Sequence, residues 1–67
     1  MKKVLRYRST WITNDHSGVI RVWCENSDLP QLNLQPLKAD EFSAVMQLLS
    51  TNNAYIYPSS KQIAAGN

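Results

Sequence analysis

Three consecutive residues, Asp15, His16 and Ser17, carry the side chains of a catalytic triad. A triad works because the nucleophile, the base and the orienting acid converge in line in space. Consecutive residues of a turn point in different directions, so this run predicts a polar hairpin turn and not a hydrolase site.

The other reactive side chains form no catalytic group either. Cys24 lies inside a β-favouring run, where we expect it to be buried and to act as a small apolar residue. Asp40 and Glu41 are neighbours about 100° apart around a predicted helix, so their carboxylates are poorly placed to act as an acid and base pair. Both lie in the first turn, where negative charge interacts favourably with the helix dipole. One histidine with one cysteine cannot complete a zinc site, and two glycines provide no phosphate-binding loop. We therefore expect no enzymatic activity, no metal, no cofactor and no small-molecule substrate.

The side chains best suited to binding a partner are concentrated in residues 6–25. This segment is predicted to form two β-strands joined by residues 14–18. This predicted hairpin holds both tryptophans and three of the seven basic residues of the chain. Arginine and aromatic side chains supply the planar, hydrogen-bonded and stacked contacts that binding surfaces use. The hairpin is therefore the predicted interaction surface.

The face that each residue of the hairpin occupies depends on its loop length. If Ile20, Val22 and Cys24 face the helix, then Arg21 and Trp23 face outward. A two- or four-residue loop would pair Trp11 with Val22, turn Tyr7 and Trp11 inward, and gather Arg6, Arg8 and Arg21 around Trp23. A three- or five-residue loop would instead form an outer aromatic patch of Tyr7, Trp11 and Trp23 beside Arg21. Gly18 favours a loop with an odd number of residues, whereas the alternation of polar and apolar residues in the first strand favours a loop with an even number. Both registers therefore stay open.

The wider pattern predicts strands at about residues 3–13, 19–25 and 54–57, with short strands at 29–34 and 62–64. A helix is predicted over residues 39–50, because Phe42, Val45, Met46 and Leu49 recur on one helical face. The expected architecture is α+β, a small antiparallel sheet of order ββ(β)αβ(β) with one helix packed on one face. We expect one domain over residues 1–67, with a frayed tail at 64–67.

The size of the chain, 67 residues, favours self-association. Cores of chains below roughly 70–80 residues rarely supply more than about 3–5 kcal/mol. A single cysteine closes no intrachain disulfide, so we expect a homodimer. Neither a signal-peptide apolar run nor a stretch long enough to cross a membrane is present, and we expect a cytoplasmic protein with no membrane contact.

The charge is unevenly distributed, although the net charge is only +2. Residues 1–21 hold five basic residues and one acidic residue, whereas residues 22–60 hold four acidic residues and one basic residue. Such a distribution can steer an anionic partner, but the net charge alone does not indicate nucleic-acid binding.

Two functions follow as hypotheses. The first is a non-enzymatic interaction protein, a homodimer or accessory subunit that docks a protein partner through Tyr7, Trp11, Arg21 and Trp23. The alternative is binding of single-stranded nucleic acid on the sheet, with Trp23 stacking on bases and Arg6, Arg8 and Arg21 contacting phosphates.

Overall fold

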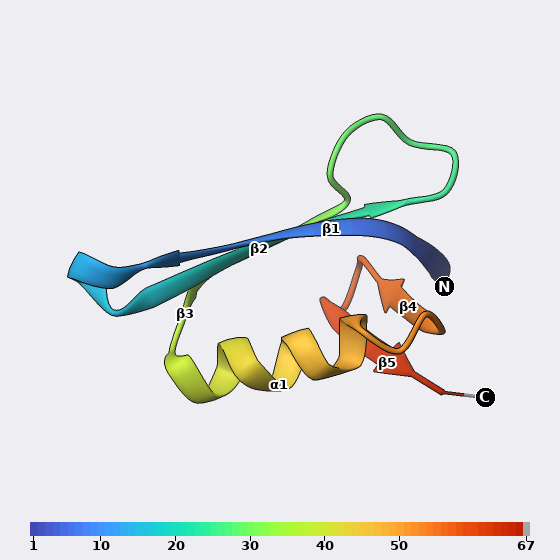
Figure 1. The fold of residues 1–67 in the computed structure, drawn as a ribbon. Helices are drawn as coiled ribbons and strands as arrows, with labels where there is room; N and C mark the ends of the chain where they lie inside the picture. Colours follow the sequence, from blue (N-terminus) through green and yellow to red (C-terminus); the bar gives the residue numbers. More distant parts are fainter. Residues whose placement is uncertain (67) are drawn as a thin grey trace.

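A long hairpin forms the frame of the molecule in the computed structural model, which describes residues 1–66 (Figure 1). Strand β1 spans Lys2–Ile12 and strand β2 spans Ser17–Cys24. Between them lie the 3-10 turn Thr13–Asp15 and His16, whose φ of 52° is left-handed. The reversal therefore depends on His16 in a conformation that is rare for residues other than glycine, and Gly18 already belongs to β2.

Within residues 1–66, five strands build one sheet in the order β3-β2-β1-β4-β5, and each neighbouring pair is antiparallel. The remaining elements are β3 (Leu32–Leu37), α1 (Ala39–Leu49), β4 (Ala54–Tyr57) and β5 (Gln62–Ala65). The predicted α+β fold with an antiparallel sheet and one helix is confirmed. No helix within residues 1–66 is both long enough and apolar enough to cross a membrane.

Strand β3 begins three residues later than predicted, because the preceding loop forms its own hydrogen bonds. The hydroxyl oxygen of Ser27 accepts hydrogen bonds from Gln31 Nε2 at 2.7 Å and from the Leu29 backbone N–H at 3.3 Å. These bonds shape the loop up to Gln31, and the residue pairing with β2 starts at Leu32. Pro36 then lies in the edge strand, where its missing N–H costs no ladder hydrogen bond on the open side.

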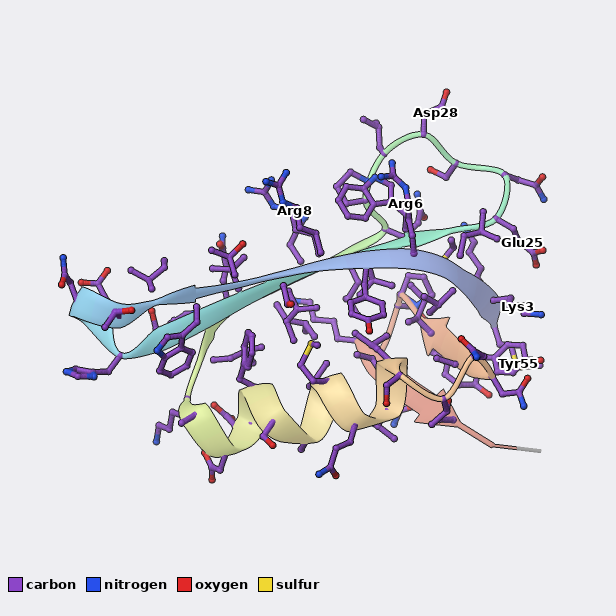
Figure 2. All side chains as sticks on the ribbon, in the orientation of Figure 1. Lys3, Arg6, Arg8, Glu25, Asp28 and Tyr55 are labelled. Atoms are coloured by element: carbon purple, nitrogen blue, oxygen red, sulfur yellow. The ribbon has the colours of Figure 1, made fainter. Side chains whose placement is uncertain are left out.

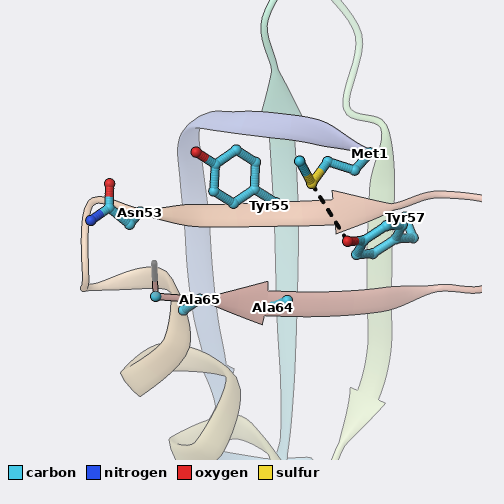
Figure 3. A pocket seen from close by; sticks show the side chains of 7 residues that line it. Met1, Asn53, Tyr55, Tyr57, Ala64 and Ala65 are labelled. Atoms are coloured by element: carbon cyan, nitrogen blue, oxygen red, sulfur yellow. Dashed lines mark hydrogen bonds between the residues drawn. The ribbon is translucent and has the colours of Figure 1, made fainter.

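The sheet curls at the start of β1. A bulge between Val4 and Arg6 bends this strand, and beyond the bend Lys2 and Lys3 pair with Ile56 and Tyr55 of β4. Strands β4 and β5 consequently cross the long hairpin, as Figure 3 shows.

The C-terminal strand extends further than expected. Ala65 pairs with Ala54, and the Gly66 N–H donates to the Asn53 carbonyl at 3.3 Å. Residues 64–66 of the predicted frayed tail thus lie beside β4, and Asn67 lies outside the described residues.

Helix α1 packs on the concave face of the curled sheet, against β2 and β5. Its first turn is held by Glu41, whose Oε1 accepts the Lys38 backbone N–H at 2.9 Å. In the described part of the chain, the core consists of seven nearly inaccessible residues: Ile20, Val22, Cys24, Leu32, Leu49, Ala54 and Ile56. The helix stripe of Phe42, Val45 and Met46 packs against this cluster.

Candidate binding face

The register of the hairpin decides which side chains share a face. Tyr7 lies opposite Val22, Arg8 opposite Arg21, and Trp11 opposite Gly18. The connection from Thr13 to His16 is a four-residue loop, so the faces are those predicted for an even loop. The predicted pairing of Trp11 with Val22 is displaced by four residues along β1, because β2 begins before Gly18 and not after it.

Trp11 and Tyr7 lie on the helix side of the sheet. The Trp11 ring meets the Phe42 ring of α1 edge-on, with centroids 5.5 Å apart. Tyr7 is half-buried and packs against the core. The four residues predicted as one interaction surface are thus divided, with Tyr7 and Trp11 on the helix side of the sheet and Arg21 and Trp23 on the opposite side.

The opposite face carries the basic residues of the hairpin. Arg6, Arg8, Arg21 and Trp23 all belong to the set of alternate positions that faces away from α1, and Figure 2 shows Arg6 and Arg8 pointing to that side. The guanidinium carbon of Arg6 lies 4.4 Å from the centroid of the Trp23 ring. This cation–π contact covers part of the indole and holds one arginine in place. We name this surface, made of Arg6, Arg8, Arg21 and Trp23, the basic face.

Two arginines of the basic face are directly opposed across the strands. Arg8 pairs with Arg21, and both side chains are exposed. Like charges at directly opposed positions destabilise a sheet. Within residues 1–66, the side-chain hydrogen bonds involve neither guanidinium group. The pair therefore costs stability in the folded chain and leaves its donors available to an external anion.

A shallow groove lies on the sheet beside this pair. It has a volume of about 430 Å³ and is lined by Arg8, Thr10 and Ile12 of β1, Val19 and Arg21 of β2, and Gln35 of β3. One end is basic and the other is apolar. The sequence interpretation did not include Thr10, Ile12, Val19 or Gln35; the signal available for the first three was the alternation of β1 and β2 once the register is known.

Acidic residues lie near one end of the basic face. Glu25 and Asp28 belong to the loop after β2, on the same side of the sheet as Arg6 in Figure 2. The positive potential is therefore expected to be strongest around Arg8 and Arg21, farther along the hairpin.

Other parts of the molecule offer less chemistry. A hollow over β4 and β5 is lined by Met1, Tyr55 and Tyr57 among others, and the Tyr57 hydroxyl donates to Met1 Sδ at 3.5 Å (Figure 3). Burial raises the pKa of the Cys24 thiol, a shift that the nearby Lys2 opposes and Glu25 reinforces. No cluster of three or more metal-ligating side chains occurs within residues 1–66.

Comparison of the chain with protein-family models, curated proteins and solved structures gives no match. The interpretation of function therefore depends on the basic face itself.

Proposed function

We propose that this protein is a non-catalytic binding module that docks an acidic protein segment on its basic face. The observation that carries the proposal is the opposed pair Arg8 and Arg21, on the side of the sheet that α1 leaves uncovered. Folding gains nothing from this pair, whereas an anionic partner would neutralise it. Arginine side chains also form bidentate contacts with carboxylates.

The groove suggests the form of the partner. From the two arginines, the groove continues along the strands to Ile12 and Val19. Successive residues on one face of a strand are about 7 Å apart, so an extended segment can match both ends. We propose a segment with Asp or Glu a few residues from an apolar side chain.

Binding by synthetic peptides tests this function. An extended peptide with two glutamates near an isoleucine should bind, whereas a peptide with glutamines in their place should bind at least about 10-fold more weakly, since hydrogen bonds to charged groups contribute about 1.5–3 kcal/mol. Arg8→Gln and Arg21→Gln should each reduce binding of the acidic peptide. Lys61→Gln is the matched control, because it removes one exposed positive charge from the turn between β4 and β5. Equal loss in all three variants would indicate a nonspecific charge effect and contradict the proposed site.

Single-stranded nucleic acid is the second candidate. The observation that favours it is that Arg6, Arg8, Arg21 and Trp23, the residues expected for nucleic-acid binding, share one face. We rank it second for two reasons. Trp23 is half-buried with Arg6 over one face of its ring, so a base can stack on that face only if Arg6 moves. The net charge of +2 is also small for phosphate binding.

A short oligothymidylate distinguishes the two candidates. Binding that is stronger than for the acidic peptide and lost in Trp23→Ala would establish nucleic acid as the partner. Peptide binding that survives in Trp23→Ala but disappears in Arg21→Gln would establish the acidic segment.

A further inference from the structure

Strand β1 has a long open edge. It pairs with β2 from Val4 to Ile12, but on its other side, among the residues that the structure describes, only Lys2 and Lys3 pair with β4. Helix α1 packs mainly against β2 and β5, and the ring contact between Phe42 and Trp11 joins it to β1. Natural sheets protect their edges, as β3 does here with Pro36 and β5 by its length of four residues. Residues 5–12 of β1 contain no proline and include strong β-formers, so this edge is suited to pairing with another strand.

The backbone groups that face the open edge can be identified. The Gln31 N–H donates to the Val22 carbonyl at 2.8 Å, so the backbone polar groups of Val22 point toward β3. Tyr7, opposite Val22, therefore forms a non-hydrogen-bonded pair with it and directs its own N–H and C=O to the open edge. Because this direction alternates along a strand, Ser9 and Trp11 do the same.

These directions limit how two copies of β1 can pair. In an antiparallel pair of identical strands, hydrogen bonds form only where Tyr7, Ser9 and Trp11 face one another. A register centred on Tyr7 sets Arg6 opposite the partner's Arg8. A register centred on Arg8 sets this residue opposite the partner's Arg8. Both oppose like charges and are disfavoured.

A register centred on Ser9 avoids this conflict. Arg8 then faces the partner's Thr10, and Arg6 faces the partner's Ile12. Registers centred farther along the strand also avoid direct opposition of arginines, but they shorten the overlap. Three hydrogen-bonded pairs, at two bonds each, give about six backbone hydrogen bonds in the Ser9-centred register.

The same register pairs aromatic residues on the inner face. Tyr7 lies opposite the partner's Trp11, and such aromatic pairs stabilise sheets. A groove of about 420 Å³ lies beside Tyr7, where β1 diverges from β4. Its lining includes Leu49 and Ala54. Trp11 is 39% exposed in the single chain. The groove, which Lys3, Arg6 and Asn52 also line, leaves space beside Tyr7 for part of the partner's indole, and the pairing is reciprocal as a two-fold axis requires.

We infer that the open edge of β1 is a homodimer interface, in which two copies pair antiparallel about Ser9 and Trp11 of each copy lies opposite Tyr7 of the other. The basic face lies on the other side of the sheet and remains exposed in both copies. The seam is short, and interfaces below about 1,200 Å² are typical of transient complexes, so the dimer should be concentration-dependent.

Sedimentation velocity over a roughly 100-fold range of protein concentration tests the dimer, since its population follows mass action. Ser9→Pro should weaken dimerisation by about 10-fold or more, because the central hydrogen bonds are lost. The Ser9 N–H makes no bond to β2, so circular dichroism should show that Ser9→Pro remains folded. Ser9→Ala keeps the N–H and should dimerise like the parent chain.

Cross-linking tests the register. Opposed residues of a hydrogen-bonded pair have Cα atoms about 5.5 Å apart, within the range of about 4.4–6.8 Å that a disulfide spans. With oxidised glutathione as oxidant, Ser9→Cys should form a covalent dimer. Ile12→Cys is the control, because its two copies would lie roughly 20 Å apart in this register. A parent chain that stays monomeric throughout, or a dimer that Ser9→Pro leaves intact and Ser9→Cys does not cross-link, would overturn the inference.

Discussion

Arg8 of β1 lies directly opposite Arg21 of β2 on the exposed face of the sheet. Replacing either arginine by threonine removes a like-charge pair and introduces a good strand former. We expect Arg8→Thr and Arg21→Thr to increase the free energy of unfolding by about 0.2–1 kcal/mol. Urea denaturation measures this change, and peptide titration should show that the more stable variants bind the acidic segment less well.

This combination separates a binding role from a structural one. If either arginine stabilised the fold, replacing it would lower both the free energy of unfolding and the affinity for the acidic peptide. Lys61→Gln should change neither quantity, because Lys61 is exposed on a turn away from the basic face. A loss of stability in both threonine variants would count against the interpretation of this pair as a binding site.

Gly18 of β2 lies beneath the ring of Phe42. A Cβ atom at position 18 would overlap several ring atoms of Phe42. We expect Gly18→Ala to lower the free energy of unfolding by about 1–3 kcal/mol, the usual cost of overpacking. Thermal unfolding measures the loss. Combining Gly18→Ala with Phe42→Leu should give a smaller loss than the sum of the two single changes, and strict additivity would show that the two residues are not coupled.

Because of the buried Cys24 thiol, we expect the free energy of unfolding to decrease at alkaline pH. Burial raises its pKa in the folded protein above the value of about 8.5 in an unfolded chain. Below the unfolded value both states keep the proton, and the contribution does not change with pH. Above it the unfolded chain loses the proton first, so stability falls as pH rises toward the folded pKa, by at most about 1.4 kcal/mol per pH unit.

Urea denaturation at several alkaline pH values measures this slope. Tyrosine and lysine also titrate there, so the informative quantity is the difference between the parent chain and Cys24→Ala. The variant should show a shallower decrease. Identical slopes would mean that the thiol does not contribute.

The inner strand residues and the helix were predictable because each depends on a local period. Ile20, Val22 and Cys24 alternate along β2, and Phe42 and Leu49 belong to one helical stripe, so these patterns identify buried positions. The face occupied by Trp11 was not predictable, because it depends on the parity of the loop. Gly18 suggested a turn by its residue type, whereas the structure uses it where the ring of Phe42 leaves no room for a side chain.

The sequence predicted two alternative compositions for the candidate binding face and did not distinguish between them. One gave a cluster of arginines around Trp23 and the other an aromatic patch with Tyr7. The four-residue connection, which ends in the left-handed His16, corresponds to the first of these alternatives, and the modest preference of histidine for this conformation does not identify the loop length. The groove beyond Arg8 also depends on β3, whose start is set by the hydrogen bonds of the Ser27 loop.

Salt should affect the two proposed interactions in opposite directions. In the Ser9-centred dimer, Arg8 lies diagonal to the partner's Arg8, about 7–8 Å away. This distance is below the Debye length of about 10 Å at 0.1 M salt, so added salt screens the repulsion and should strengthen the dimer. Binding of an acidic peptide depends on attraction to the same arginine and should weaken as salt rises. Sedimentation and peptide titration at matched salt concentrations measure the two trends, and Arg8→Thr should flatten both. A dimer that dissociates as salt increases would exclude this register, because its interface would then depend on attractive charges.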